Sequence, residues 1–412
     1  MRKLLRNARY LAPDLSIAEG DLLLDGDLIA QILTRGESPA RPPDVDLNLE
    51  GYLIFPGLIN AHDHLIEAFP GPAPTRPFAA WHEWEAHCKT SPAFRHLQRL
   101  SAADLYTLGL YRNALSGVTL VVDHFPREVR ATFQGNPLVA LLEHFFLAHS
   151  VSAHRLEWGQ GIQEEFAQAR GILPFILHVG EGTTQDLQEE CESLNRLGAL
   201  AENTVLVNPI GLQQAQLEVV AARRASLVWC PCSCQNVFGA HPPLQAAHQA
   251  GIRIALGTDR ALSHPGLLFD DLRLARRLNQ ELLGGVFSDA DLIRMVTSGA
   301  AEILGVGKGF GSIAPGQTAN LLVFPAGEGS PFEAFFALTP GRVSMVIQRG
   351  GMVFGDEALR TASALDVGQY SECLVEDQPK ILLGRPFHLL ERIENKLEET
   401  VRFPFLPLFP GK

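Results

Sequence analysis

Two histidines, His62 and His64, stand two residues apart in the segment 56–64, which reads PGLINAHDH and follows a short apolar run. Residues i and i+2 of an extended segment project to the same side, so both imidazoles can bind one cation. A His-x-His pair alone is a weak signal, but its place directly after an apolar run and a Pro-Gly pair strengthens it. We therefore interpret both histidines as candidate metal ligands.

Polar side chains also follow three other apolar runs. They are His178 and Glu181 after residues 175–177, Asn208 after residues 205–207, and Asp259 after residues 255–258. Any one of them could be a core side chain bonded to a backbone carbonyl. Chance does not readily place several polar residues directly after apolar runs. We therefore expect their side chains to converge on the same cation as the two histidines.

The segments between these residues indicate which fold must position them. From about residue 54, short apolar runs alternate with longer segments that can form helices. The runs cover residues 53–55, 118–122, 175–177, 205–207, 227–229 and 252–256. Such runs are typical of a parallel sheet covered on both faces. Their number favours an α/β fold of about 250 residues, a (β/α)8 TIM-like barrel, whose active site lies at the C-terminal ends of its strands.

The third and fourth strands of this barrel must lie within residues 125–172, which is a cramped segment. Residues 145–148, with the sequence FFLA, are the predicted fourth strand, and the third is expected to be truncated.

A smaller domain is predicted from both ends of the chain. Residues 22–33 read as two short strands joined by the Asp25-Gly26-Asp27 turn, which is a hairpin signal. Strand-and-turn character returns from Gly311. We therefore predict a small β-sandwich domain from residues 1–53 and 311–369, a metal-binding barrel over residues 54–310, and a C-terminal extension over residues 370–412.

The composition limits the partners and the compartment. With 34 basic and 46 acidic residues, the net charge is −12, which argues against nucleic acid or an anionic membrane as the main partner. No apolar run reaches the roughly 18 residues of a spanning helix, and the N-terminus lacks the apolar stretch of a secretory signal. Six cysteines do not make a disulfide framework in 412 residues, so we expect a reduced, cytoplasmic protein.

Taken together, the motifs resemble those of the amidohydrolase superfamily, in particular its cytosine/guanine deaminase and triazine chlorohydrolase branch. The resemblance covers about residues 1–360. It is carried by Pro56-Gly57 with His62-x-His64, by the segments 178–181 (HVGE), 230–233 (CPCS) and 256–259 (LGTD), and by the re-entry segment 311–320. These motifs are specific for the superfamily but do not identify a substrate.

The resemblance implies one divalent metal ion, zinc or alternatively iron, bound by His62, His64, His178 and Asp259 with an open position for water. Zinc bound there would lower the pKa of that water to about 7. Glu181 matches the family's proton shuttle, which takes the proton of the water and passes it to the leaving nitrogen. Asp259 would also orient the hydroxide, so Glu181 and Asp259 are the predicted catalytic residues.

A second branch of the superfamily binds two metals bridged by a carboxylated lysine on the fourth strand. The predicted barrel region contains only Lys89 and Lys308, and neither lies near that strand. Composition therefore excludes the lysine-bridged site. A bridging glutamate, for instance Glu143 or Glu157, stays an open alternative.

Two positions depart from the resemblance. The re-entry segment usually ends in aspartate where this chain has Asn320, and the second departure matters more. The deaminase branch normally has a histidine at the end of the sixth strand, where this chain has Asn208. Asparagine can donate a hydrogen bond to a developing oxyanion, but it cannot carry a charge or move a proton. His124, just past the second strand, is the candidate replacement, and a histidine bonded to a loop carbonyl is the plain alternative.

Trp81 lies on the long segment after the first strand, which often covers the site in such barrels. It is expected to stack on a flat substrate ring, with core packing as the equal alternative. The predicted substrate-binding residues are thus Asn208, His124 and Trp81.

Cys230, Cys232 and Cys234 alternate along one segment and suggest a structural zinc site. Such sites usually need a second cysteine pair elsewhere, which this chain lacks. The family's Cys-Pro-x-Ser pattern accounts for Cys230 without a metal, so structural zinc is the minor alternative.

These inferences favour a metal-dependent hydrolase of non-peptide C–N bonds, first of all a deaminase of a planar nitrogen heterocycle. Ring-opening hydrolysis of a cyclic amide, of the imidazolone type, is the alternative within enzymes. A catalytically impaired binding homologue is the alternative outside enzymes, because Asn208 replaces the usual histidine. Related enzymes are commonly dimers, so a homodimer is consistent with the resemblance.

Overall fold

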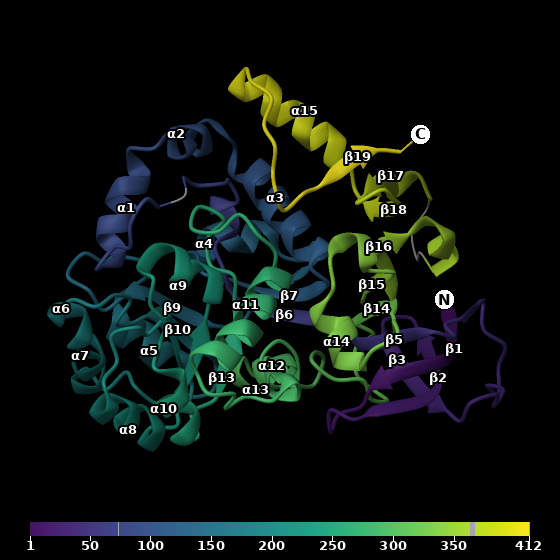
Figure 1. Ribbon diagram of the computed structural model, residues 1–412, viewed down its shortest axis with the longest axis horizontal. Helices are drawn as coiled ribbons and strands as arrows, with labels where there is room; N and C mark the ends of the chain where they lie inside the picture. The colour runs from purple at the N-terminus through teal and green to yellow at the C-terminus, as the bar shows by residue number, and fades with distance from the viewer. Residues whose placement is uncertain (73, 363–366, 412) are drawn as a thin grey trace.

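Short parallel strands form the centre of the half of the molecule that holds the blue and teal segments in Figure 1. The computed structural model describes residues 1–72, 74–362 and 367–411. In sheet order, one group is β6 (Leu58–Asp63), β7 (Val118–Asp123) and β8 (Ala140–Leu141), and the other is β13 (Ile254–Leu256), β12 (Ser226–Trp229), β11 (Thr204–Val207), β10 (Phe175–His178) and β9 (Phe146–Ser150). Neighbouring strands are parallel, and most of their residues are buried, as expected for a sheet covered on both faces.

The two parallel sheets meet beside the candidate site. An isolated parallel bridge joins Asp63, the last residue of β6, to Asp259, which follows β13. Strands β8 and β9 belong to different sheets. The predicted fourth strand is confirmed as β9, and the expected truncated third strand is the two-residue β8.

Helices and short turns separate the parallel strands and continue around them (Figure 1). They are α1 (Trp81–Lys89), α2 (Pro92–Arg99), α3 (Ala102–Leu115), α4 (Arg127–Arg130), α5 (Ile162–Ala169), α6 (Gln185–Gln188), α7 (Glu190–Arg196), α8 (Gln214–Ala222), α9 (Pro231–Phe238), α10 (Leu244–Gln249), α11 (Leu268–Glu281), α12 (Asp289–Arg294), α13 (Ser298–Ile303), α14 (Pro331–Phe336) and α15 (Pro386–Leu397). Local sequence sets their ends. Ser101 accepts a hydrogen bond from Asp104 N at the start of α3, and Pro231 occupies the first turn of α9.

The first barrel strand differs from the prediction. Residues 53–55 were expected to be that strand, but they belong to β5 (Tyr52–Pro56), which pairs with strands of the other half of the molecule. The strand that leads to the candidate site is β6, so His62 lies inside a strand and His64 just after it. The apolar run continues on both sides of Pro56 and Gly57. The sequence pattern therefore did not show that one strand ends there and that a strand of another sheet begins.

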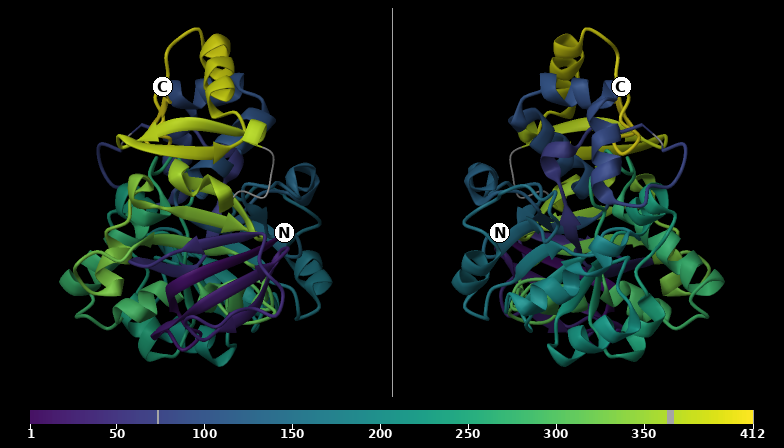
Figure 2. Two further views of the ribbon diagram at one scale, coloured as in Figure 1. Left: turned by 90° about the vertical axis from the view of Figure 1, so that its right-hand side faces the viewer. Right: turned by 90° about the vertical axis from the view of Figure 1, so that its left-hand side faces the viewer.

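Both ends of the chain build one large sheet, which faces the viewer in the left view of Figure 2. Its order is β19 (Leu408–Pro410), β17 (Tyr370–Val375), β18 (Gln378–Leu383), β16 (Gly351–Asp356), β15 (Met345–Gln348), β14 (Leu321–Pro325), β5, β1 (Arg2–Leu11), β2 (Ile17–Asp25) and β3 (Leu28–Leu33), with β4 (Val45–Asn48) paired to β1. The junction between the two chain ends is the antiparallel pair of β5 and β14, in which Phe55 faces Leu322.

The predicted Asp-Gly hairpin is confirmed between β2 and β3. Gly26 has a φ of 60°, a left-handed conformation that glycine adopts without steric cost. The strand order runs continuously from β19 to β3, and the β-sandwich arrangement stays a prediction.

The C-terminal helix α15 packs on the helices that precede β7, at the top of Figure 1. The buried carboxylate of Asp104 on α3 accepts hydrogen bonds from Arg392 Nε at 2.8 Å and Lys396 Nζ at 2.9 Å. Residues 370–411 therefore contribute both to the large sheet and to the cover of α3. None of the helices in the described ranges is long and apolar enough to cross a membrane.

Candidate active site

Four buried side chains converge where β6, β10 and β13 end. His62 and His64 come from the end of β6, His178 is the last residue of β10, and Asp259 follows β13. One candidate ligand atom from each of them lies within 4.8 Å of the others. His62 Nε2 and His64 Nε2 lie 3.6 Å and 3.5 Å from Asp259 Oδ1. The convergence expected from strand ends is thus present.

One polar atom of each of these four side chains has no hydrogen-bond partner in the protein. His62 Nε2, His64 Nε2, His178 Nε2 and Asp259 Oδ1 are buried, and none makes a hydrogen bond within the described residues. Buried polar atoms in native proteins are normally satisfied. Three imidazoles and one carboxylate are also the donors that a divalent transition metal prefers. The residues therefore fit a divalent metal ion.

The electrostatics keep the ligands in their binding forms. Burial lowers the pKa of His62 to about 4, against the opposing effect of Asp259. Burial raises the pKa of Asp259, but His62 and the Arg260 guanidinium outweigh that effect and hold the pKa well below its usual range. Neutral imidazoles beside an ionised carboxylate are the protonation states that bind a cation.

A network of buried side chains fixes the segment that carries the two histidines. Asp63, between them, accepts hydrogen bonds from Arg112 Nη1 at 3.2 Å and Asn113 Nδ2 at 2.8 Å, both from α3. Arg112 Nη1 also donates to the carbonyl oxygen of Asp259 at 3.1 Å. Helix α3 therefore ties the β6 end to the β13 end. The sequence did signal this network, through a charged residue inside a largely apolar helix, but the signal was missed.

Asp259 is held in a defined orientation. Its φ is 56°, a left-handed conformation that is uncommon for a residue other than glycine. Its Oδ2 accepts a hydrogen bond of 2.6 Å from Ser233 Oγ on α9, and its backbone N–H donates to the carbonyl of His62. Because Oδ2 is engaged by Ser233, Oδ1 remains for the cation.

Glu181 lies against the metal group. Its Oε2 is 2.9 Å from His178 Nδ1, and its Oε1 accepts a hydrogen bond of 3.1 Å from Asn208 Nδ2. Asn208 has a φ of 48°, and its Oδ1 accepts from Cys230 N at 3.0 Å and from Cys234 Sγ at 3.3 Å. Asn208 Oδ1 is thus engaged twice by protein donors, and Asn208 Nδ2 contacts the reacting region through Glu181.

His124 lies among the histidines of the group. Its ring centre is 4.9 Å from that of His62, 5.5 Å from that of His64 and 5.1 Å from that of His178. Its Nε2 donates to the carbonyl of Ala148 at 3.2 Å, and its Nδ1 has no partner among the described residues. Burial lowers the pKa of His124 well below its usual value. The neutral ring therefore presents a lone pair at Nδ1.

A small pocket adjoins this group, and its free space of about 10 Å³ is about that of one water molecule. Its lining consists of Trp81, Trp84, Glu181, Ser233, Val237, Phe238, Asp259 and Arg260. Helix α1 covers it, and an isolated bridge between Ala80 and Gly182 attaches the start of α1 to the loop after β10. Of the predicted residues, Trp81, Glu181 and Asp259 line this pocket, whereas His124 and Asn208 lie outside its lining. Sequence reasoning did not single out Arg260.

The remaining candidates lie elsewhere. Glu143 and Glu157 are exposed and lie outside the metal group. All six cysteines are free and buried, and the one metal-type group found in the described residues is the histidine and aspartate group. His149 packs between Trp81 and Trp158, with ring centres 4.9 Å apart in both contacts.

Comparison with known proteins shows what the chain is similar to. Residues 175–353 match the model of the amidohydrolase family. A 5-methylthioadenosine/S-adenosylhomocysteine deaminase of Halobacterium salinarum is 27% identical over 362 residues, which cover 76% of this chain and 81% of that protein.

Solved structures agree in fold. An adenosine deaminase from Xanthomonas campestris with bound zinc has a TM-score of 0.73 at 18% identity, over 96% of this chain and 98% of that one. An atrazine chlorohydrolase from Arthrobacter aurescens TC1 complexed with zinc has a TM-score of 0.71 at 17% identity, over 96% of this chain and 100% of that one. The motifs, the family match over residues 175–353 and these likenesses agree: the chain carries an amidohydrolase family domain and is similar to deaminases of that family.

Proposed function

We propose that this protein is a zinc-dependent hydrolase of non-peptide C–N bonds that deaminates a small nitrogen heterocycle. The observation that carries the proposal is the buried group of His62, His64, His178 and Asp259, with the Glu181 carboxylate 2.9 Å from His178. Curated relatives with deaminase names support the reaction class.

The donor set supports zinc as the ion. Three imidazoles and one carboxylate suit zinc, and iron is the alternative that elemental analysis separates. When bound, the ion supplies Lewis acidity and activates water near neutral pH. The catalytic role of Asp259 then follows from its hydrogen bonds, because Ser233 fixes Oδ2 and leaves Oδ1 directed to the reacting centre.

Glu181 is the proposed proton carrier. Its carboxylate lines the pocket, so it can take a proton from the attacking water and deliver it to the leaving nitrogen. The hydrogen bond from Asn208 Nδ2 holds Oε1 in place, which makes Asn208 a positioning residue that reaches the substrate through Glu181. The amide thus has a function although it cannot carry a proton.

His124 and Trp81 complete the proposed site. His124 lies beside the metal group with an unpartnered Nδ1, which can accept a hydrogen bond from an amino group of the substrate. Trp81 lines the pocket and offers a flat apolar surface for a planar ring.

The same proposal extends to the architecture. We infer that the two parallel sheets form one (β/α)8 barrel over residues 54–310, and the bridge between Asp63 and Asp259 supports the contact of its first and last strands. Residues 1–53 and 311–369 are the proposed small β domain, because β1, β5, β14 and β15 share a sheet. Residues 370–412 are the proposed extension.

The test is ammonia release from aminated heterocycles by zinc-loaded protein, together with metal analysis. We expect about one zinc per chain and ammonia from at least one ring. Glu181→Gln should keep the zinc and lose about 10²–10⁴-fold in kcat, which is the range for general acid–base catalysis. A new carboxylate without ammonia would indicate ring opening of a cyclic amide instead. Ammonia release that Glu181→Gln leaves unchanged would contradict the proposed proton carrier.

A further inference from the structure

Arg260 is a buried arginine that makes no side-chain hydrogen bond to the described residues. It directly follows Asp259, its side chain is 8% exposed, and it lines the pocket beside the metal group. Its closest charged contacts are made at Nε, with Glu67 Oε2 at 3.5 Å and Asp259 Oδ1 at 3.7 Å. The two Nη atoms, which carry four of the five N–H donors of a guanidinium, make no hydrogen bond to the described residues.

The other two buried arginines of this half of the molecule behave differently. Arg112 donates to the carbonyls of Gly266, Asp259 and His264 in addition to Asp63. Arg130 donates to the carbonyls of Leu142, Glu143 and Phe145. Both of these structural arginines thus donate hydrogen bonds to backbone carbonyl oxygens. Arg260 does not, which indicates that its donors serve something that the chain itself does not supply.

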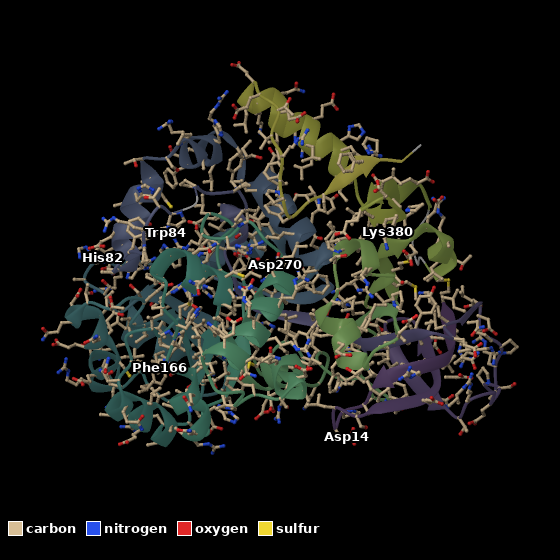
Figure 3. All side chains as sticks on the ribbon, viewed as in Figure 1. Asp14, His82, Trp84, Phe166, Asp270 and Lys380 are labelled. Carbon is tan, nitrogen blue, oxygen red and sulfur yellow. The ribbon has the colours of Figure 1, made fainter. Side chains whose placement is uncertain are left out.

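Two further donors in the same pocket also lack partners. The indole nitrogens Trp81 Nε1 and Trp84 Nε1 are buried without a hydrogen bond among the described residues, and both rings line the pocket. The Arg260 guanidinium carbon lies 5.4 Å from the centre of the Trp84 ring, and Figure 3 labels Trp84 on α1. Indoles and guanidinium can donate but not accept. The pocket lining therefore contains donors without protein acceptors, which an acceptor-rich ligand would satisfy.

The two carboxylates in the pocket lining do not meet this requirement. Glu181 is engaged by Asn208 and His178, and Asp259 by Ser233 and the metal position. Glu67 lies closest to Nε of Arg260, and neither Nη atom of Arg260 forms a hydrogen bond with the described residues. A planar carboxylate fits such a fork through two parallel hydrogen bonds, which a lysine could not provide.

We infer that the substrate carries a carboxylate, which binds to the Nη atoms of Arg260 and to the indole N–H groups of Trp81 and Trp84. The inference rests on the proposed function and narrows it to a small aminated heterocycle, or a related amidine, that bears a carboxylate. Because the free space in the pocket is about 10 Å³, the side chains of α1 that line it must move aside when the carboxylate binds.

The first experiment measures binding without turnover. Nicotinate and nicotinamide are planar, carry no amino group on the ring to be released, and differ in the carboxylate. We expect nicotinate to raise the melting temperature of the zinc-loaded protein and nicotinamide to leave it unchanged. Arg260→Met should weaken nicotinate binding at least tenfold, while Arg127→Met, at an exposed arginine on α4, should bind as the wild type does.

The outcomes separate the inference from metal chelation. Nicotinate binding that persists in zinc-loaded Arg260→Met would place the carboxylate on the metal and overturn the inference, as would equal binding of both probes or binding of neither. Zinc per chain is measured for every variant. If Arg260→Met does not hold zinc, Arg260→Lys replaces it, since the lysine keeps the charge but loses the fork and should also weaken binding.

The second experiment compares turnover of matched pairs. Aminopyrimidines, aminotriazines and aminopurines are each supplied with and without a ring carboxylate, and ammonia is measured. Preference for the carboxylated member by at least tenfold in kcat/KM, lost in Arg260→Met, supports the inference. If the neutral member releases ammonia at an equal rate, the proposed deaminase stands and the inference of a substrate carboxylate is wrong. If nicotinate binds through Arg260 but no pair releases ammonia, the carboxylate site stands and the proposed deaminase is wrong.

Discussion

Asn208 Nδ2 donates a hydrogen bond of 3.1 Å to Glu181 Oε1, so the ends of β10 and β11 are joined at the point where a proton must move. The asparagine is itself fixed by Cys230 N and Cys234 Sγ. In the sequence, Asn208 stands where the resemblance predicts a histidine. In the structure, its amide group is a hydrogen-bond donor held in place beside Glu181.

Replacing Asn208 by aspartate tests this role. The substitution keeps the shape and the contact with Cys230 N but removes the donor and places a second carboxylate beside Glu181. We expect kcat to fall by about 10²-fold, the lower end of the range for acid–base catalysis, with KM changed less. Zinc per chain should stay near one, and a loss of zinc instead would assign Asn208 to the metal site.

Removing the metal should destabilise the protein. Without the ion, three buried imidazoles and the Asp259 Oδ1 lack partners. A chelator should therefore lower the melting temperature, and zinc at about 100 times its Kd should restore about 2.7 kcal/mol of stability. His64→Ala should reduce zinc to below about a tenth of an ion per chain, because one of four ligands is lost. The control His144→Ala changes an exposed histidine and should keep the full zinc content.

The cysteines should be unreactive in the folded protein. All six are buried, and burial raises the pKa of Cys88 and of Cys191 to about 12. Because the thiolate is the reactive form, a thiol reagent at pH 8 should modify none of them quickly and all six in denaturant. Cys232→Ser should retain one zinc per chain. Zinc loss in that variant would revive the structural zinc site near Cys230.

Acid should weaken the attachment of α15 to α3. Burial alone would raise the pKa of Asp104, but hydrogen bonds from Lys396, Ser101 and Arg392 outweigh it and bring the pKa to about 2. Because the folded pKa lies below the unfolded value of about 3.9, the ionised carboxylate stabilises the fold above pH 4. This contribution is lost as the pH falls towards 2.

Asp104→Asn is the corresponding variant. Its two cationic partners are 52% and 39% exposed, so solvent screens the ion pairs and we expect a loss of about 1–2 kcal/mol at pH 7. Denaturant unfolding should show this difference shrinking between pH 4 and pH 2. Asp377→Asn, at an exposed aspartate, is the matched control. A constant difference across this range would show that the carboxylate charge is not involved.

The sequence predicted the metal group because strand ends are visible in a sequence. His62, His178 and Asp259 each follow or end a short apolar run, and parallel strands bring such ends together. The short β8 was also foreseeable, because the segment between β7 and β9 had no room for a longer strand. Side-chain identity and strand order were sufficient for these features.

Other features depend on direction and packing, which a single sequence does not show. In the sequence, Arg260 is an ordinary charged residue after Asp259. Only the structure shows that its side chain is buried beside the pocket and makes no hydrogen bond to the described residues. The start of β6 was hidden for a similar reason, because Pro56 and Gly57 interrupt an apolar run that serves two sheets. Hydrophobicity alone cannot show that the two halves of that run belong to different sheets.

The pairing of β5 with β14 has a consequence for synthesis of the chain. Phe55 faces Leu322, so the N-terminal strand leaves the ribosome about 270 residues before its partner. At about 5–20 residues per second, the edge of β5 stays open for roughly 15 to 50 seconds. During that interval the nascent chain exposes an apolar strand edge of the kind that other chains can join. Completion of the large sheet, rather than of the catalytic half, is therefore the step at which we expect chaperone assistance to matter most.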